Sequence, residues 1–203
     1  MKKIILSVSI LLLAITSINA QASFGIKGGV NFASILNENI NGVKGRTSFN
    51  VGLVAEVETS YSTAVQVELL YSGQGFKYNG GGIIGGVEAL EDTYRLDYLN
   101  LPVVFKYYFK EGFSFESGPQ LGILLSAKAV DADVKVGDAF TDLTFDWLIG
   151  FGYKFDNGFN VNARYTLGLT DIWKGPTVNP PYYYYNYGKV NGVFQLTLGY
   201  YFN

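Results

Sequence analysis

Ten charged side chains recur at the polar positions of segments in which polar and apolar residues alternate. Five are basic and five acidic, a balance that favours a packed interior in which these charges pair with one another. They are Lys27, Glu56, Glu58, Glu68, Lys106, Glu116, Lys128, Asp146, Lys154 and Arg164. The chain contains no His and no Cys, so a histidine general base and a thiolate nucleophile are excluded. We therefore predict no enzyme activity and no catalytic residue, although a site built from carboxylates alone stays open.

Two short motifs resemble ligand-binding loops, but neither has the other features that such a loop requires. GGGIIG (residues 80–85) fits a dinucleotide fingerprint by letter, but it lies in no βαβ unit. We interpret it as a flexible loop. DADVKVGD (residues 131–138) resembles a calcium loop, yet Lys135 occupies a ligand position and Gly137 comes one place late. We predict a solvated acidic loop there, no metal site and no cofactor.

The charged residues must be positioned by strands, because the alternation has a period of two. In residues 159–170, FNVNARYTLGLT, apolar and polar side chains strictly alternate apart from one glycine. Eight such segments occur: 24–34, 49–59, 63–75, 94–110, 113–129, 143–156, 159–170 and 189–202. Connections of about three residues alternate with connections of about 11 to 18. An even number of strands with short turns at one end and long loops at the other is typical of an outer-membrane barrel.

The two faces of these strands decide the environment. One face carries large aliphatic and aromatic side chains, and the other carries the ten charges among Gly, Asn, Ser and Thr. Turning a basic residue to lipid near the midplane costs about 2–4 kcal/mol. We therefore predict an all-β fold, an eight-stranded antiparallel up-and-down transmembrane barrel with its charges inside. The alternative is a soluble lipocalin-like barrel, but its narrow lumen would have to hold the large aromatics.

The start of the chain has the layout of a secretory signal peptide. Lys2 and Lys3 precede an apolar run that ends near Ile18, and Ala20 closes the segment. We predict residues 1–20 as a cleaved signal peptide and residues 21–203 as one outer-membrane barrel domain. This topology puts both mature termini at the short-turn, periplasmic end and the loops 37–47, 77–91, 131–141 and 171–188 outside the cell. The chain offers no stretch long and apolar enough for a transmembrane helix.

Two prolines fall inside predicted strands, although a closed barrel has no edge strand to accommodate them. Pro102 and Pro119 lie at nearly the same height if the hairpin turns at residues 110–112. We predict a shared β-bulge at these two residues. The same turn would place Lys106 directly opposite Glu116.

Three segments resemble the PorT-like outer-membrane β-barrels of Bacteroidota, many of which are described as porin-family proteins. They are YLNLPVVFKYYF (residues 98–109), SGPQLGILLSAK (117–128) and GFNVNARYTLGLTDI (158–172). The resemblance covers the whole mature chain and implies a barrel in the outer membrane of a Gram-negative cell, without implying one activity. The family often has a carboxylate where Asn100 stands. Outer-membrane barrels usually end in an aromatic residue, whereas Phe202 is followed by Asn203 here.

We predict a structural or surface-interaction protein with a lumen filled by side chains. The alternative is a narrow or gated channel for ions or small solutes. The expected partners are outer-membrane lipid and the barrel-assembly machinery, with a monomeric state, an unknown loop ligand and, at a net charge of −2, no nucleic acid. A tyrosine cluster either binds a surface ligand or joins the aromatic girdle, which we favour. It comprises Tyr182, Tyr183, Tyr184, Tyr185 and Tyr187.

Overall fold

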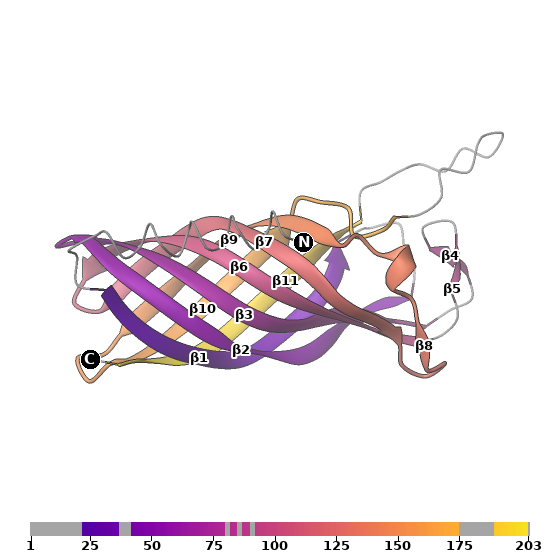
Figure 1. Cartoon of the computed structure of the whole chain (residues 1–203), viewed down its shortest axis with the longest axis horizontal. Helices are drawn as coiled ribbons and strands as arrows, with labels where there is room; N and C mark the ends of the chain where they lie inside the picture. Colours follow the sequence, from indigo (N-terminus) through magenta and orange to yellow (C-terminus); the bar gives the residue numbers. More distant parts are fainter. Residues whose placement is uncertain are drawn as a thin grey trace, which may run out of the picture.

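Eight long strands close into a ring in the described part of the chain (Figure 1). The computed structural model describes residues 22–36, 42–79, 82–84, 87–89, 92–174 and 189–202. The barrel strands are β1 (Ala22–Leu36), β2 (Val43–Ser60), β3 (Thr63–Tyr78), β6 (Asp92–Lys110), β7 (Phe113–Ala129), β9 (Leu143–Lys154), β10 (Phe159–Gly168) and β11 (Val190–Phe202). Each strand pairs antiparallel with its neighbours, and β11 pairs with β1. The predicted eight-stranded antiparallel barrel is confirmed; the predicted signal peptide lies outside the described residues.

Short and long connections lie at opposite ends of the barrel. Phe24 pairs with Phe202, so β1 begins beside the end of β11, at the end that also carries the three short turns. Gly112 and Gly158 have positive φ angles of 75° and 88° in two of those turns, a conformation that glycine adopts without steric cost. We call this end the short-turn end and the other the long-connection end.

The long connections contain more secondary structure than the sequence suggests. The glycine-rich segment, which we interpreted as a flexible loop, includes a small hairpin of β4 (Gly82–Ile84) and β5 (Val87–Ala89). The segment after β7 forms β8 (Val134–Lys135) and the 3-10 helix η1 (Gly137–Ala139). The strand β2 begins six residues earlier than predicted. Four strands therefore extend beyond the others at the long-connection end: β2, β3, β6 and β7 (Figure 1).

The shared bulge predicted at the prolines is wrong. The β6–β7 register is the same at Pro102–Gln120 and at Lys106–Glu116, with the pairing interrupted between them but not shifted, and Pro119 pairs with Trp147 of β9. The β6–β7 register instead shifts near the other end, between Asp97 and Tyr98, where β7 carries one extra residue. The β2–β3 register shifts between Gly45 and Asn50. Further shifts lie beside the short turns, between Glu58 and Ser60 and between Tyr108 and Lys110. The prolines are thus accommodated without any slip between strands.

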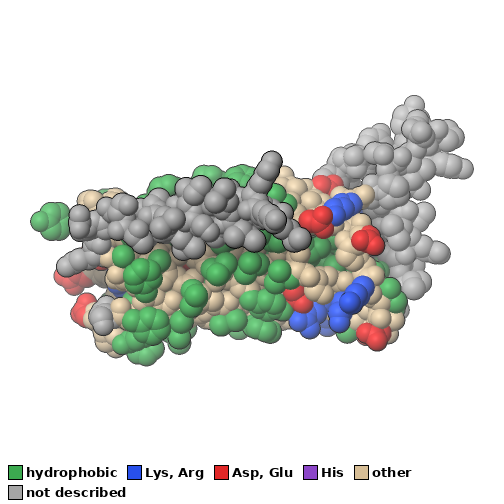
Figure 2. Space-filling view, in the orientation of Figure 1, with side chains coloured by type: hydrophobic (Ala, Val, Ile, Leu, Met, Phe, Trp, Pro, Cys, Tyr) green, Lys and Arg blue, Asp and Glu red, His purple; other side chains and the backbone are tan. Residues whose placement is uncertain are grey.

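The outward face is an apolar belt of exposed aliphatic and aromatic side chains (Figure 2). At the short-turn end, aromatic rings contact one another along β6, β7 and β9, with ring centroids 6.2 Å apart for Phe109–Phe113 and 4.6 Å for Phe113–Tyr153. Phe159, Tyr200 and Phe202 form a second contiguous group. Rings at this height are typical of the interfacial girdle of membrane barrels. No helix in the described residues is long and apolar enough to span a bilayer.

Candidate functional site

The lumen contains a chain of ion pairs that crosses the barrel. Arg164 lies at its centre, with Nη1 2.7 Å from Glu68 Oε1 and Nε 2.5 Å from Glu116 Oε2. Lys27 Nζ lies 3.0 Å from the same Glu68 oxygen. All four side chains are almost completely buried. This half of the ion-pair chain therefore links β1, β3, β7 and β10 by charge-assisted hydrogen bonds.

The ion-pair chain continues toward the short-turn end. Lys106 bridges Glu116 and Glu56, with Nζ–O distances of 3.3 and 2.7 Å. Lys154 then bridges Glu56 and Glu58, at 2.9 and 3.4 Å. Lys106 and Glu116 stand directly opposite each other on β6 and β7, in the predicted register. Eight charges, four of each sign, thus alternate along one continuous path.

Two of the ten predicted lumen charges do not belong to the ion-pair chain. Asp146 is buried in the lumen, but its carboxylate accepts a hydrogen bond from Gln120 Nε2 (2.9 Å) and makes no ion pair with a described residue. Lys128 is exposed on the outside of the barrel. Its predicted place in the lumen is wrong because the extra residue in β7 reverses the inward and outward parity beyond Leu125. Ala127 and Ala129 face inward in its place.

Neutral side chains also donate hydrogen bonds to the carboxylates of the ion-pair chain. The charge pattern of the sequence did not identify these residues. The Tyr201 hydroxyl donates to Glu56 Oε2 (2.8 Å), and the Tyr108 hydroxyl donates to Glu56 Oε1 (3.1 Å). Asn162 Nδ2 donates to Glu116 Oε1 at 2.8 Å. Each of these residues stands at an inward position of its strand, which is the signal by which strand parity could have found them. These bonds satisfy further hydrogen-bonding capacity of Glu56 and Glu116, which lowers the cost of burying their charges. Glu68 Oε2 and Arg164 Nη2, in contrast, are buried without a hydrogen-bond partner among the described residues.

Glycines on the inward face of β9 make room for the central charges. A Cβ at Gly150 would lie 2.7 Å from Arg164 Cγ. A Cβ at Gly152 would lie 2.6 Å from Glu116 Oε1 and 2.9 Å from Ser114 Oγ. All three separations are too short for a real Cβ atom. The Arg164 and Glu116 side chains therefore occupy the volume that side chains of β9 would otherwise fill.

An uncharged polar layer lies beside the ion-pair chain. Asn31 Nδ2 donates to Ser72 Oγ (3.0 Å) and to the carbonyl of Gly73 (2.9 Å). Asn50 and Gln195 donate to Asn31 Oδ1. Asn100 is buried and has no protein partner for either amide atom among the described residues. Buried amides of this kind are normally satisfied by ordered water.

The long-connection end of the barrel is closed by apolar side chains. Phe140 and Trp173 stack with ring centroids 4.4 Å apart, and Phe76 stacks on Tyr94 at 4.9 Å. The two stacks meet through Phe76 and Trp173. The buried members of this cluster, which we call the apolar plug, are Ile35, Phe76, Tyr78, Tyr94, Leu96, Tyr98, Ala127, Ala129, Phe140 and Ile172.

Lys189 lies at the edge of the plug, where residue 189 precedes β11. Its ammonium lies 5.6 Å from the centre of the Trp173 ring. Burial lowers the pKa of this ammonium, and Asp171 partly offsets the effect. A cation over an aromatic face is attracted to the ring. This cation–π contact therefore fixes the start of β11 against the apolar plug.

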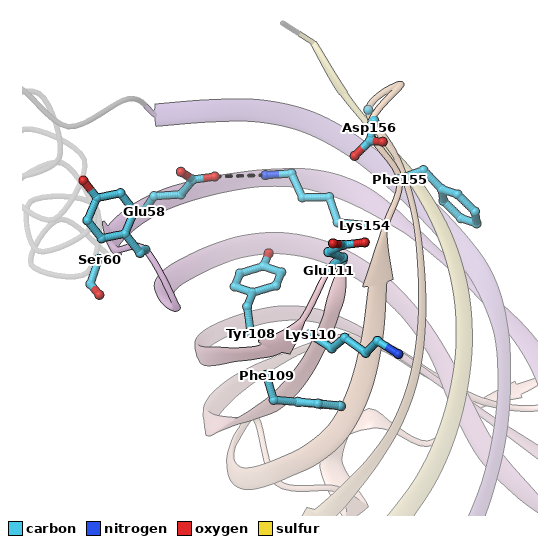
Figure 3. A pocket seen from close by; sticks show the side chains of 12 residues that line it. Glu58, Ser60, Tyr108, Phe109, Lys110, Glu111, Lys154, Phe155 and Asp156 are labelled. Carbon is cyan, nitrogen blue, oxygen red and sulfur yellow. Dashed lines mark hydrogen bonds and ion pairs between the residues drawn. The ribbon is translucent and has the colours of Figure 1, made fainter.

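A cavity of about 500 Å³ opens at the short-turn end (Figure 3). It is lined by carboxylates and ammonium groups together with Tyr108 and Phe109. The Lys154–Glu58 ion pair lies across it, marked by the dashed line in Figure 3. The cavity thus ends where the ion-pair chain begins. No group of three His, Cys, Asp or Glu residues suited to a metal ion occurs in the described part of the chain.

Residues 19–174 match a protein family described as the outer membrane protein beta-barrel domain. The match covers about three quarters of the chain. The chain belongs to this family. The barrel is therefore an outer-membrane protein, and the apolar belt is its lipid-facing surface. No curated protein matches the sequence.

Solved structures similar to this barrel share its architecture at low sequence identity. The attachment invasion locus protein Ail of Yersinia pestis is 12% identical, with a TM-score of 0.50, over 91% of this chain and 100% of its own. The Neisserial surface protein A is 14% identical, with a TM-score of 0.55, over 89% of this chain and 99% of its own. At these identities the likeness shows the fold alone. The predicted tyrosine cluster, Tyr182 to Tyr187, lies outside the described residues.

Proposed function

We propose that this protein is a monomeric structural or surface-interaction barrel, which anchors in the outer membrane and presents its long connections to the exterior. The observation that carries the proposal is the filled lumen. A continuous chain of eight alternating charges crosses its interior, and the apolar plug closes its long-connection end. A barrel of eight strands has room inside for little more than its own side chains.

Within the family we propose a PorT-like member of the Bacteroidota type, on the strength of the three resembling segments. The partners are membrane lipid and, during biogenesis, the barrel-assembly machinery. Cleavage after Ala20 and periplasmic termini complete the proposal. Catalysis is not part of it, because the buried carboxylates of the ion-pair chain are engaged by cations.

The second candidate function is a narrow or gated channel. The cavity of about 500 Å³ at the short-turn end favours it, because that cavity leads from the mouth of the barrel to Lys154. A path for ions would require the ion-pair chain to separate and the apolar plug to move. We place it second because both obstacles lie in series along the same lumen.

The orientation is tested by epitope insertion. Asp133 stands in the turn between β7 and β8 with a positive φ of 52° and is exposed, and exposed turns of this kind tolerate insertions. Asn157 stands in the short turn between β9 and β10. A tag after Asp133 should be labelled by antibody on intact cells, whereas a tag after Asn157 should be labelled only after the outer membrane is permeabilised. The reverse pattern would show that the long connections face the periplasm.

A further inference from the structure

Five basic side chains form a row around the outside of the barrel at its long-connection end. Lys44 of β2 pairs in register with Lys77 of β3, Arg95 of β6 pairs with Lys128 of β7, and Lys128 pairs with Lys135 of β8. Residues directly opposite each other on neighbouring strands point to the same face, with Cβ atoms about 4.5–5.5 Å apart. Lys77 stands opposite Thr93, two residues from Arg95. We call these five residues the basic row.

Two separate bulges bring lysines into the basic row. In the rest of β2 and β7 the even-numbered residues face the lumen, as Glu56 and Glu116 do. The register shift between β2 and β3 reverses this parity before Lys44, and the extra residue of β7 reverses it before Lys128. Both lysines are consequently exposed on the outside instead of buried in the lumen. Bulges are frequently used to redirect a side chain at a functional position.

The charges of the basic row are mostly not neutralised by the protein. Like charges directly opposite each other destabilise a pair of strands, and the row contains three such pairs. Arg95 is held by Asp97 through Nε, at 2.8 Å from Oδ2, and donates to the Tyr71 hydroxyl at 3.1 Å. No carboxylate of a described residue lies within 4.0 Å of the ammonium groups of Lys44, Lys77, Lys128 and Lys135. Since the whole chain has a net charge of −2, this cluster does not reflect a generally basic protein.

The basic row lies just beyond the lipid-facing belt. Leu99 is an outward apolar residue of β6, and Arg95 stands four residues further along the same face. With a rise of about 3.3 Å per residue and a tilt of about 40°, the four residues correspond to roughly 10 Å along the membrane normal. Figure 2 shows Lys and Arg side chains gathered beside the end of the belt, over the ends of β2 and β3. This height is that of the lipid headgroups.

We propose that the basic row binds the phosphate groups of a phosphorylated glycolipid in the surrounding leaflet. Successive members of the basic row stand directly or diagonally opposite each other, with Cβ atoms about 4.5–8 Å apart. At this spacing their ammonium groups and the guanidinium can bind a headgroup that carries more than one phosphate. The cost of opposing the like charges is removed when phosphate oxygens lie between them. The inference rests on the proposed function in one respect, because it takes the long-connection end to face the glycolipid leaflet of the outer membrane.

Binding can be measured on the full-length mature barrel in phosphatidylcholine nanodiscs to which lipid A with two phosphates is added. Native mass spectrometry should retain at least one lipid A molecule on the wild-type barrel and fewer molecules of dephosphorylated lipid A. The double variant Lys77→Ser with Lys128→Ser should bind about 10- to 30-fold more weakly, since each basic residue near an anionic surface contributes about fivefold. The charge-retaining variant Lys77→Arg with Lys128→Arg should bind like the wild type.

The controls separate this inference from its alternatives. Lys110→Ser removes an exposed lysine at the short-turn end and should leave binding unchanged. Equal retention of phosphorylated and dephosphorylated lipid A, or an unaffected Lys77→Ser with Lys128→Ser variant, would overturn the proposal. If the barrel retained phosphatidylglycerol as well as lipid A, the proposal that the ligand is a glycolipid would be wrong. If it retained inorganic phosphate equally well, the proposal that the ligand is a lipid would be wrong. Because nanodiscs expose both leaflets to the same lipid, the result is independent of the orientation tested by the epitope tags.

Discussion

Replacing Glu116 by Gln should lower the free energy of unfolding of the barrel by about 3–5 kcal/mol, the usual cost of removing one partner from a buried ion pair. Glu116 is completely buried and lies between two cations, Arg164 and Lys106. The neutral amide would leave the ion-pair chain with one uncompensated positive charge. Urea unfolding in phospholipid vesicles, followed by the fluorescence of Trp147 and Trp173, measures the loss.

The double variant Lys106→Met with Glu116→Gln should lose less stability than Glu116→Gln alone. It removes the surplus charge, leaving Arg164 on Glu68 and Glu56 on Lys154. Glu58→Gln is the matched control, because Glu58 lies at the mouth with its side chain 54% exposed, where an ion pair contributes at most about 1 kcal/mol. Strictly additive effects of the two substitutions, or an equal loss for Glu58→Gln, would show that the charges do not act as one chain.

Replacing Ile149 by Arg should destabilise the barrel by about 2–4 kcal/mol, whereas Leu143→Arg should cost about 0–1 kcal/mol. Both side chains are exposed on the outside of β9, 48% for Ile149 and 56% for Leu143. Ile149 stands in the middle of the strand and Leu143 is its first residue. The same substitution on the same face therefore differs only in its depth in the membrane. Refolding into vesicles and urea unfolding measure the two costs.

The contrast between Ile149 and Leu143 tests which face meets lipid and where the membrane lies. Equal costs at the two positions would contradict the assignment of the outside of β9 to the lipid. A larger cost at Leu143 would place the midplane of the membrane near the long-connection end. In that case the basic row could not lie at headgroup height.

The fold and most of the inward charges could be predicted from the sequence, because an alternation with a period of two identifies the strands and also assigns each side chain to one of their two faces. The short turn at residues 110–112 alone predicts that Lys106 and Glu116 stand opposite each other, and the structure confirms it. The other ion pairs could not be predicted, since they cross the lumen between strands that are not neighbours. Lys27, for example, stands opposite Gly52 of β2 and contacts Glu68 on the strand beyond it.

Bulges account for the main errors in the sequence interpretation. A single extra residue reverses the parity of everything that follows it, and nothing in the letters around Leu125 marks the position. The same limitation hid the outward placement of Lys128. Lys44 was missed for another reason, because the predicted strand began at residue 49 whereas β2 begins at Val43. The two prolines suggested a bulge at the wrong height. A proline needs no bulge where the hydrogen-bonded pairing of its strand is interrupted without a change of register, as it is between β6 and β7.

The central claim is that the lumen is closed, and conductance across a planar bilayer tests it most directly. Purified barrel should give at most small, intermittent currents, because the ion-pair chain and the apolar plug block the same path in series. Liposomes containing the barrel should not swell in isotonic sugar solutions. Steady conductance at the level of a general porin, or swelling in sugars, would contradict the filled lumen and support the channel.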